Sequence, residues 1–271
     1  MINAFQKSKG VLMGIRGASL IVIIFLWIHD LKQGYPLYIP VVATVLMTGI
    51  GYFLSRLLGN LTASSENTKK LGLLHMELDP EAFIAAYRDI PAKLPEGSRF
   101  RAVSSSYLAD GYYASGDPGQ AVKVLDRGFE TLKKEDDKKS PSLQGLYHGN
   151  RLLYLIEEGK IEEAKKEAEI LERIITSCES TNKPLAENLG TTLKLRKARI
   201  LIKEGTVIND TWLKGFLSGA HYNLLRLEIY RTIAENALLR GDKEEASEFR
   251  DRLIKESGKT CFGNFAKELL I

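Results

Sequence analysis

Two apolar segments near the N-terminus constrain this chain more than any other feature of its sequence. Residues 11–29 contain one charged side chain, Arg16, and residues 37–54 contain none. The polar turn 30–36 separates them. Because about 20 apolar residues span a bilayer as a helix, the sequence predicts a transmembrane hairpin within residues 1–60, with spans at about 11–29 and 37–54.

Two other structures would also place apolar residues at the start of a chain. A cleaved signal peptide would account for the first segment, but no Ala-x-Ala-like cleavage site follows it and a second apolar segment does. A pair of buried core helices would account for both segments. Such helices normally have a polar face, which these segments lack. The hairpin is therefore the expectation that fits both segments.

Charges beside the two segments indicate how the hairpin is oriented. Basic residues accompany its outer ends, whereas the turn has one basic and one acidic residue (outer ends Lys7, Lys9, Arg16, Arg56, Lys69 and Lys70; turn Asp30 and Lys32). Cytoplasmic flanks are enriched in Lys and Arg. We therefore expect an integral plasma-membrane protein whose two termini, and whose residues after the hairpin, are cytoplasmic.

The rest of the chain is electrically neutral. The whole sequence has 38 basic and 34 acidic residues, of which residues 1–60 hold five and one, so residues 61–271 hold 33 of each. A neutral domain gives no electrostatic reason to expect nucleic acid as a partner. The two cysteines, Cys178 and Cys261, lie outside any Cys-x-x-Cys motif, which agrees with free thiols in a reducing compartment.

Helix signals dominate the chain after a polar connector at residues 61–70. Residues 71–271 are rich in Leu, Ala, Glu, Lys and Arg, and proline is confined to a few boundaries. Asp79 followed by Pro80 is typical of a helix start. We therefore expect an all-α domain over residues 71–271.

A helix–turn–helix junction recurs in this domain, with a Gly followed five residues later by an Ala. The three copies are Gly116 with Ala121, Gly159 with Ala164, and Gly241 with Ala246. Gly takes the left-handed conformation that ends a helix, and the Asp residues after the first and third Gly are typical helix caps (Asp117 and Asp242). The Ala predicts a close approach of the two helices.

These junctions resemble those of the tetratricopeptide repeat, whose helix pairs have small residues at the positions of Ala109, Gly116 and Ala121. The best copy covers about 102–134, and weaker copies cover about 145–177 and 227–257. Gly205 marks a degenerate copy, and the Gly-to-Gly spacings of 43, 46 and 36 are irregular. The resemblance implies an α-solenoid of irregular helix pairs. A non-repeating helical bundle that reuses the same turn chemistry is the alternative.

No motif for catalysis or metal binding is present. The four histidines lack paired-ligand spacing, and the sequence has no Gly-x-Ser-x-Gly, P-loop or dinucleotide motif. The Glu-Glu pairs 157–158, 162–163 and 244–245 are expected on solvated helix faces or beside helix N-termini. We therefore expect no catalytic residues, no cofactor and no metal.

The repeat register places one set of polar residues toward the inner groove of the solenoid. The candidate partner-binding residues are Asp110, Asn150, Arg196, Arg199, Arg231 and Glu235, with Ser106 beside them. In repeat proteins that grip a peptide's C-terminal carboxylate, Asn and Arg stand at the positions of Asn150 and Arg196. The three other positions fall on Ser106, Asp110 and Thr192, where that family uses Lys or Asn, and Asp110 would repel a carboxylate.

Together these features predict a membrane-anchored, non-enzymatic scaffold. Its repeats would recruit a protein or peptide at the cytoplasmic face, and the hairpin would contact the lipid bilayer. The alternative is a structural subunit of a larger membrane complex, whose hairpin contacts partner spans. The oligomeric state is not encoded in any pattern of this sequence.

Overall fold

The computed structural model describes residues 66–269, except 133–137, 218 and 220–222, together with scattered positions between 13 and 48. The chain divides into two compact units, residues 1–70 and 71–271. All regular structure in the described residues is helical, which confirms the all-α prediction.

The described positions of the first unit are mostly helical, and two of them join the predicted spans. The indole Nε1 of Trp27 donates a hydrogen bond of 2.9 Å to Thr44 Oγ1. Across the described part of the chain, every helix is too short or too polar to traverse a membrane. The span expected at 37–54 lies largely outside the described residues, and the span expected at 11–29 lies partly outside them, so the hairpin stays a prediction.

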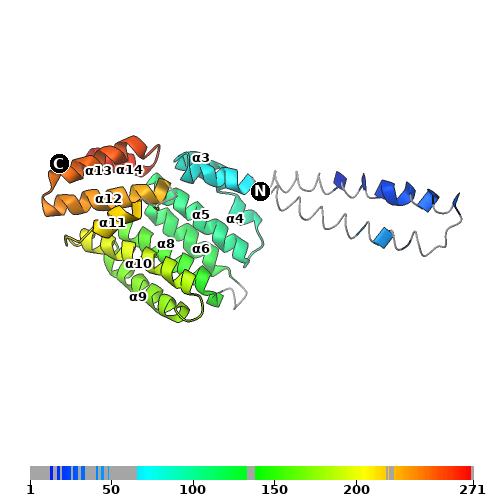
Figure 1. Ribbon diagram of the computed structural model, residues 1–271, viewed down its shortest axis with the longest axis horizontal. Helices are drawn as coiled ribbons and strands as arrows, with labels where there is room; N and C mark the ends of the chain where they lie inside the picture. Colours follow the sequence, from blue (N-terminus) through cyan, green and yellow to red (C-terminus); the bar gives the residue numbers. More distant parts are fainter. Residues whose placement is uncertain are drawn as a thin grey trace. The chain divides into compact units, whose positions relative to one another are not determined.

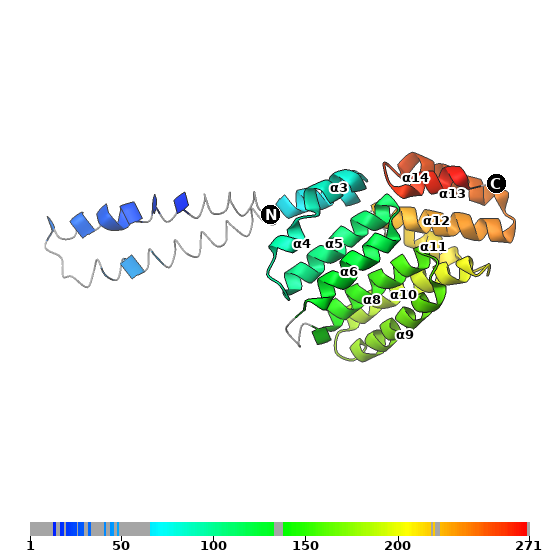
Figure 2. The ribbon, with the colours of Figure 1, turned by 180° about the vertical axis from the view of Figure 1, so that it is seen from behind.

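The second unit is a stack of helices of unequal length (Figure 1, and from behind Figure 2). Residues 66–75 are helical and precede the labelled elements. These are α3 (Pro80–Tyr87), α4 (Ile90–Lys93), α5 (Arg99–Ser115), α6 (Pro118–Glu130), α8 (Pro141–Glu157), α9 (Ile161–Cys178), α10 (Lys183–Lys203), α11 (Thr211–Leu217), α12 (Asn223–Arg240), α13 (Lys243–Glu256) and α14 (Cys261–Glu268).

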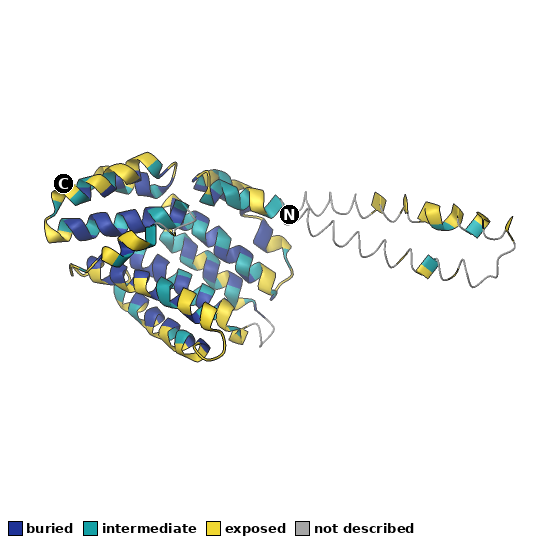
Figure 3. Cartoon of the chain, in the orientation of Figure 1, coloured by how far each residue is buried: buried dark blue, intermediate teal, exposed yellow. Residues whose placement is uncertain are grey.

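Successive helices pack as pairs, and the pairs pack on one another. The most extensive contacts are within the pairs α5–α6, α8–α9 and α12–α13, while α10 lies against α8, α9 and α12. Buried residues gather on α5, α8 and α12, whereas α9 and α13 present many exposed residues (Figure 3). An apolar cluster that includes Leu152, Leu171 and Leu193 fills the space between α8, α9 and α10. Helices α5, α8, α10 and α12 thus form the inner layer of the domain.

The helix junctions have the local structure that the sequence predicts. Gly116, Gly159 and Gly241 have φ of 94°, 80° and 79°, in the left-handed region. Asp117 and Asp242 cap α6 and α13, because their side chains accept the backbone N–H groups of Gln120 and Glu245. The three junction alanines, Ala121, Ala164 and Ala246, are fully buried.

The start of the second unit contacts its end. The backbone N–H of Lys259, in the turn between α13 and α14, donates to the Leu78 carbonyl at 2.9 Å, and its Nζ lies 2.5 Å from the carboxylate of Asp79. Asn223, at the start of α12, donates to the Met76 carbonyl at 3.1 Å. The stack of helices is therefore closed by contacts between segments about 180 residues apart.

Candidate functional site

One part of the inner layer is a cluster of polar side chains between α5 and α8. Asn150 donates to Ser106 Oγ at 2.8 Å and to Asp110 Oδ1 at 3.4 Å. The hydroxyl of Tyr154 donates to the same Asp110 oxygen at 2.5 Å. Tyr154 is fully buried, and its ring lies 5.6 Å from that of Tyr113. Asp110 therefore accepts hydrogen bonds inside an aromatic environment.

A second part joins α8, α10 and α12 through charged groups. Arg199 donates from Nη2 to Glu157 Oε1 at 2.5 Å and from Nη1 to Glu235. Arg231 contacts the same two carboxylates, Glu157 at 2.8 Å and Glu235 at 3.3 Å. Lys203 adds a contact of 3.3 Å to Glu235. The two glutamates are thus paired with two arginines and a lysine. We call these five residues the inner charge network (Glu157, Arg199, Lys203, Arg231 and Glu235).

A neighbouring ion pair completes the inner layer. Arg196 Nη1 lies 2.6 Å from Glu228 Oε2, and both side chains are only 9% exposed. Nε of Arg196 is buried without a hydrogen-bond partner. Both charged groups lose their hydration when they are buried, so this ion pair stabilises the fold only if its close contact outweighs the cost of desolvation.

Two carboxyl groups of the inner layer have shifted pKa values of opposite sign. Desolvation raises the pKa of Asp110 to about 7, although the hydrogen bond from Tyr154 favours the ionised form. Burial also acts to raise the pKa of Glu157, but the guanidinium groups of Arg199 and Arg231 outweigh it and lower that pKa to about 2. Glu157 is therefore ionised at neutral pH, whereas Asp110 is divided between its two forms.

Helix α14 covers one side of this inner layer. Phe262 is fully buried, and its ring meets that of Tyr113 edge-on at 5.9 Å between centroids. The ring of Phe265 lies 4.1 Å from the guanidinium carbon of Arg231, a cation–π contact. The inner face is thus covered by the chain's own last helix and has few free hydrogen-bonding groups.

The structure brings the predicted groove residues together. Asp110 and Asn150 lie in the polar cluster, Arg199, Arg231 and Glu235 in the inner charge network, and Arg196 in the ion pair beside them. Every one of them is bonded within the chain. That they contact a partner stays a prediction.

Some residues that complete this layer are not apparent from the sequence. The expectation that Glu157 is solvated was wrong, because its side chain is 6% exposed and pairs with two arginines. No sequence pattern distinguishes Glu228 or Tyr154 either. The one available signal is the pair Arg196 and Arg199, three residues apart on the face of α10 whose other buried residues are apolar. Two buried arginines require acids on the facing helices.

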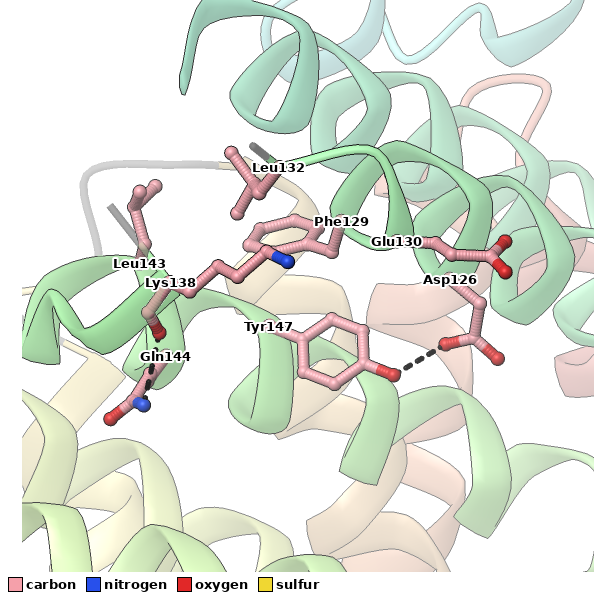
Figure 4. Close-up of a pocket in the computed structure, with 8 residues that line it drawn as sticks. All are labelled: Asp126, Phe129, Glu130, Leu132, Lys138, Leu143, Gln144 and Tyr147. Carbon is pink, nitrogen blue, oxygen red and sulfur yellow. Dashed lines mark hydrogen bonds between the residues drawn. The ribbon is translucent and has the colours of Figure 1, made fainter. Parts of the chain in front are cut away.

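An open recess lies on the outer side, between α6 and α8, and we call it the α6–α8 recess (Figure 4). It has a volume of about 530 Å³ and is lined by Asp126, Phe129, Glu130, Leu132, Lys138, Leu143, Gln144 and Tyr147. The rings of Phe129 and Tyr147 are 4.9 Å apart. Apolar side chains in the recess are thus surrounded by charged and amide groups.

Hydrogen bonds hold one wall of this recess in place. The hydroxyl of Tyr147 donates to Asp126 Oδ1 at 2.8 Å (Figure 4), and Arg151 Nε donates to the same oxygen at 3.2 Å. Arg151 also pairs with Glu167 of α9, which lies 2.6 Å from Nδ1 of His148. The aromatic wall is therefore tied to three helices, α6, α8 and α9.

Comparisons with protein-family models, with curated proteins and with solved structures gave no match. A function for this chain therefore follows only from its own residues and their geometry.

Proposed function

We propose that this chain is a membrane-anchored scaffold, in which a hairpin of two transmembrane helices carries a repeat domain that recruits a protein or peptide. In this proposal the spans are residues 11–29 and 37–54, and residues 71–271 form a cytoplasmic domain similar to tetratricopeptide repeats. The chain has no catalytic role of its own.

The anchor is supported by the apolar side chains of the first unit. Nine large hydrophobic residues described there are between 41% and 74% exposed: Met13, Leu20, Ile21, Val22, Ile24, Phe25, Ile28, Val41 and Val45. Soluble proteins rarely leave so many apolar side chains together in water, whereas lipid is a favourable environment for them. The hydrogen bond between Trp27 and Thr44 supports a hairpin, because it joins the two expected spans.

The repeat domain is supported by the recurrence of one junction. Three helix pairs share a left-handed Gly and a buried Ala five residues later. The first two pairs pack on each other, and the third packs on α10. When helix pairs stack in this way, a surface forms at the boundary between each pair and the next. The unequal helix lengths agree with irregular repeats.

The α6–α8 recess is the observation that carries the recruiting function. It lies between consecutive helix pairs, and its aromatic wall is held by hydrogen bonds to three helices. Interface cores are enriched in aromatic residues surrounded by a polar rim. The recess therefore fits an apolar side chain of a partner, while charged groups such as Glu130 contact the surrounding backbone.

Site-specific photo-crosslinking in intact cells tests the proposal. A photoreactive amino acid replaces Glu130 at the rim of the recess, and a control replaces the exposed Glu248 on α13. We expect one discrete adduct from position 130, none from position 248, and loss of the adduct when Phe129→Ala is added. Equal labelling from both positions, or labelling that survives Phe129→Ala, contradicts recruitment at the recess.

The alternative, a structural subunit of a larger membrane complex, is favoured by one observation. A β-carbon added to Gly14 or Gly17 of the first expected span would meet no atom of the described residues within 4 Å, so a partner helix can approach closely there. The same crosslinker placed at Ile21, which is 69% exposed, distinguishes the two proposals. An adduct from position 21 without one from position 130 supports the subunit.

A further inference from the structure

A second recess, between α4, α5 and α6, has an unusual lining. It has a volume of about 230 Å³, and three of its lining residues are the arginines Arg88, Arg101 and Arg127. No acidic residue lines it; the others are Pro91, Ala92, Ser105, Leu108, Tyr112, Val124 and Gly128. We call it the basic recess. It combines three cations with hydroxyl groups and an apolar floor.

These arginines are poorly compensated by the chain. Arg127 has no carboxylate within 4.0 Å among the described residues. Of the acids that the structure describes, Arg88 reaches only its neighbour Asp89 and Arg101 only Glu96, each at 3.9 Å, and both acids are more than 60% exposed. In the inner charge network, by contrast, Arg199 and Arg231 meet carboxylates at 2.5 and 2.8 Å. Three arginines that line one small space without an acidic neighbour in the lining make it a region of positive potential that attracts an anion.

The dimensions of the basic recess limit what that anion is. Pockets for whole drug-sized ligands measure about 300–1,000 Å³, so this one accommodates a small group of a larger molecule. Guanidinium groups bind phosphate oxygens through paired hydrogen bonds, and Tyr112 and Ser105 place hydroxyl groups in the same lining. The apolar floor formed by Pro91, Leu108 and their neighbours suits hydrocarbon next to the phosphate.

We propose that the basic recess binds the phosphate headgroup of an anionic phospholipid. This inference rests on the proposed membrane anchor, which keeps the domain beside a bilayer. The three helices that form the recess are among the first after the connector, since Arg88 follows Lys70 by 18 residues. The negative surface potential of anionic lipid attracts basic side chains that lie near the membrane surface. Binding there fixes the orientation of the tethered domain.

Hydrogen–deuterium exchange of the full chain in nonionic detergent tests this assignment. The three probes are dioctanoyl phosphatidic acid, dioctanoyl phosphatidylcholine and inorganic phosphate. We expect phosphatidic acid to slow exchange in residues 88–101 by about tenfold. We expect phosphatidylcholine and inorganic phosphate to leave the exchange unchanged.

Matched variants show whether the arginines of the recess are responsible. Arg127→Gln alters an exposed side chain and is expected to fold, and with Arg101→Gln it should abolish the protection. Arg173→Gln removes a similarly exposed arginine on α9 and should retain the protection.

Three results overturn the assignment. Protection by inorganic phosphate alone assigns the recess to a soluble phosphate compound. If no probe slows the exchange, the basic recess is not a phosphate-binding site. If phosphatidic acid still slows the exchange in Arg127→Gln and in the double variant, the lipid is attracted to the protein without binding to these arginines. The measurement needs neither a bilayer nor a protein partner, so its failure is distinguishable from failure of the crosslinking experiment.

Discussion

Asp110 is a carboxyl group that burial keeps partly protonated at neutral pH. Its pKa is about 7 in the folded chain, against an ordinary value of 3.8. Folding therefore takes up a proton between these values, and the free energy of unfolding should fall by a few kcal/mol as pH rises from about 4 to about 7. Asp110→Asn retains an oxygen to accept from Tyr154 and should remove that contribution. Chemical denaturation at several pH values checks this, and equal pH slopes for the two proteins would contradict it.

Glu157 titrates in the opposite direction. Its pKa is lowered from 4.5 to about 2, so its contribution to stability is complete above pH 4.5 and is lost as pH falls toward 2. Glu157→Gln leaves Arg199 and Arg231 partly unpaired and should cost about 3–5 kcal/mol at pH 7. Glu158→Gln is the matched control, because the Glu158 side chain is 28% exposed and Lys160 is its one ionic partner among the described residues. This substitution should cost under about 1 kcal/mol. Equal melting temperatures for the two variants would show that the network contributes little.

The environment of Glu157 shows that the sequence does not determine whether a single charged side chain is buried. Two successive glutamates before a glycine are typical of a solvated helix end, and Glu158 follows that rule. Glu157 is buried because Arg199 and Arg231, 42 and 74 residues later, face it from α10 and α12. Such a pairing depends on how the helices stack, and no local pattern records it. The repeat register read from the sequence does indicate which arginines share the inner face, because the face on which a residue lies follows from helix periodicity alone.

The pair α5–α6 depends on one glycine at its crossing. A β-carbon added to Gly128 would lie 2.2 Å from Cβ of Ser105. Gly128→Ala should therefore force the helices apart and destabilise the domain by about 1–3 kcal/mol. Gly190 is also helical but has nothing within 4 Å of its added β-carbon, so Gly190→Ala should be neutral or stabilise by up to about 1 kcal/mol. Thermal unfolding of the full chain in detergent compares the two variants. The same change in melting temperature for both would show that the helices do not cross closely at Gly128.

The junctions between helices are the elements that the sequence predicts best. Asp117, Gly116 and Ala121 act through neighbours within five residues, so their cap, turn and burial follow from local chemistry. Pro91 shows the limit of such signals. Its place in the sequence predicts an end or a bend of the helix that starts at Pro80, but α3 ends earlier, at Tyr87, and Pro91 lies in the first turn of α4. Proline is equally compatible with the first turn of a helix.

At the scale of the domain, α14 determines whether the inner layer is covered. Phe262 is fully buried against Tyr113, so Phe262→Ala should destabilise the second unit by about 3–5 kcal/mol. Phe100→Ala is the matched control, because that side chain is 75% exposed and its loss should change stability by under about 0.5 kcal/mol. Hydrogen exchange in α5 and α12 gives a second measurement. Unchanged exchange in Phe262→Ala would show that α14 does not protect the inner layer. No sequence pattern predicts this closure, since α14 belongs to no repeat.

Membrane topology is the property of the whole chain on which its proposed role depends. In the proposed topology two crossings return the chain to its starting side, and the basic flanks predict that this side is the cytoplasm. If residues 11–29 did not cross, residues 71–271 would lie on the opposite side from the N-terminus. Accessibility of single cysteines to a membrane-impermeant thiol reagent distinguishes these arrangements.

The background for this labelling is Cys178→Ala with Cys261→Ala, which removes both native thiols. Gln33→Cys lies in the turn between the expected spans, and Lys183→Cys replaces a side chain of the second unit that is 79% exposed. In intact cells we expect Gln33→Cys to be labelled and Lys183→Cys to be labelled only after lysis. Labelling of Lys183→Cys before lysis would place the domain outside the cytoplasm. Protection of both positions before lysis would mean that the apolar segments do not form a hairpin across the membrane, because its turn must face the outside whenever the two flanks are inside.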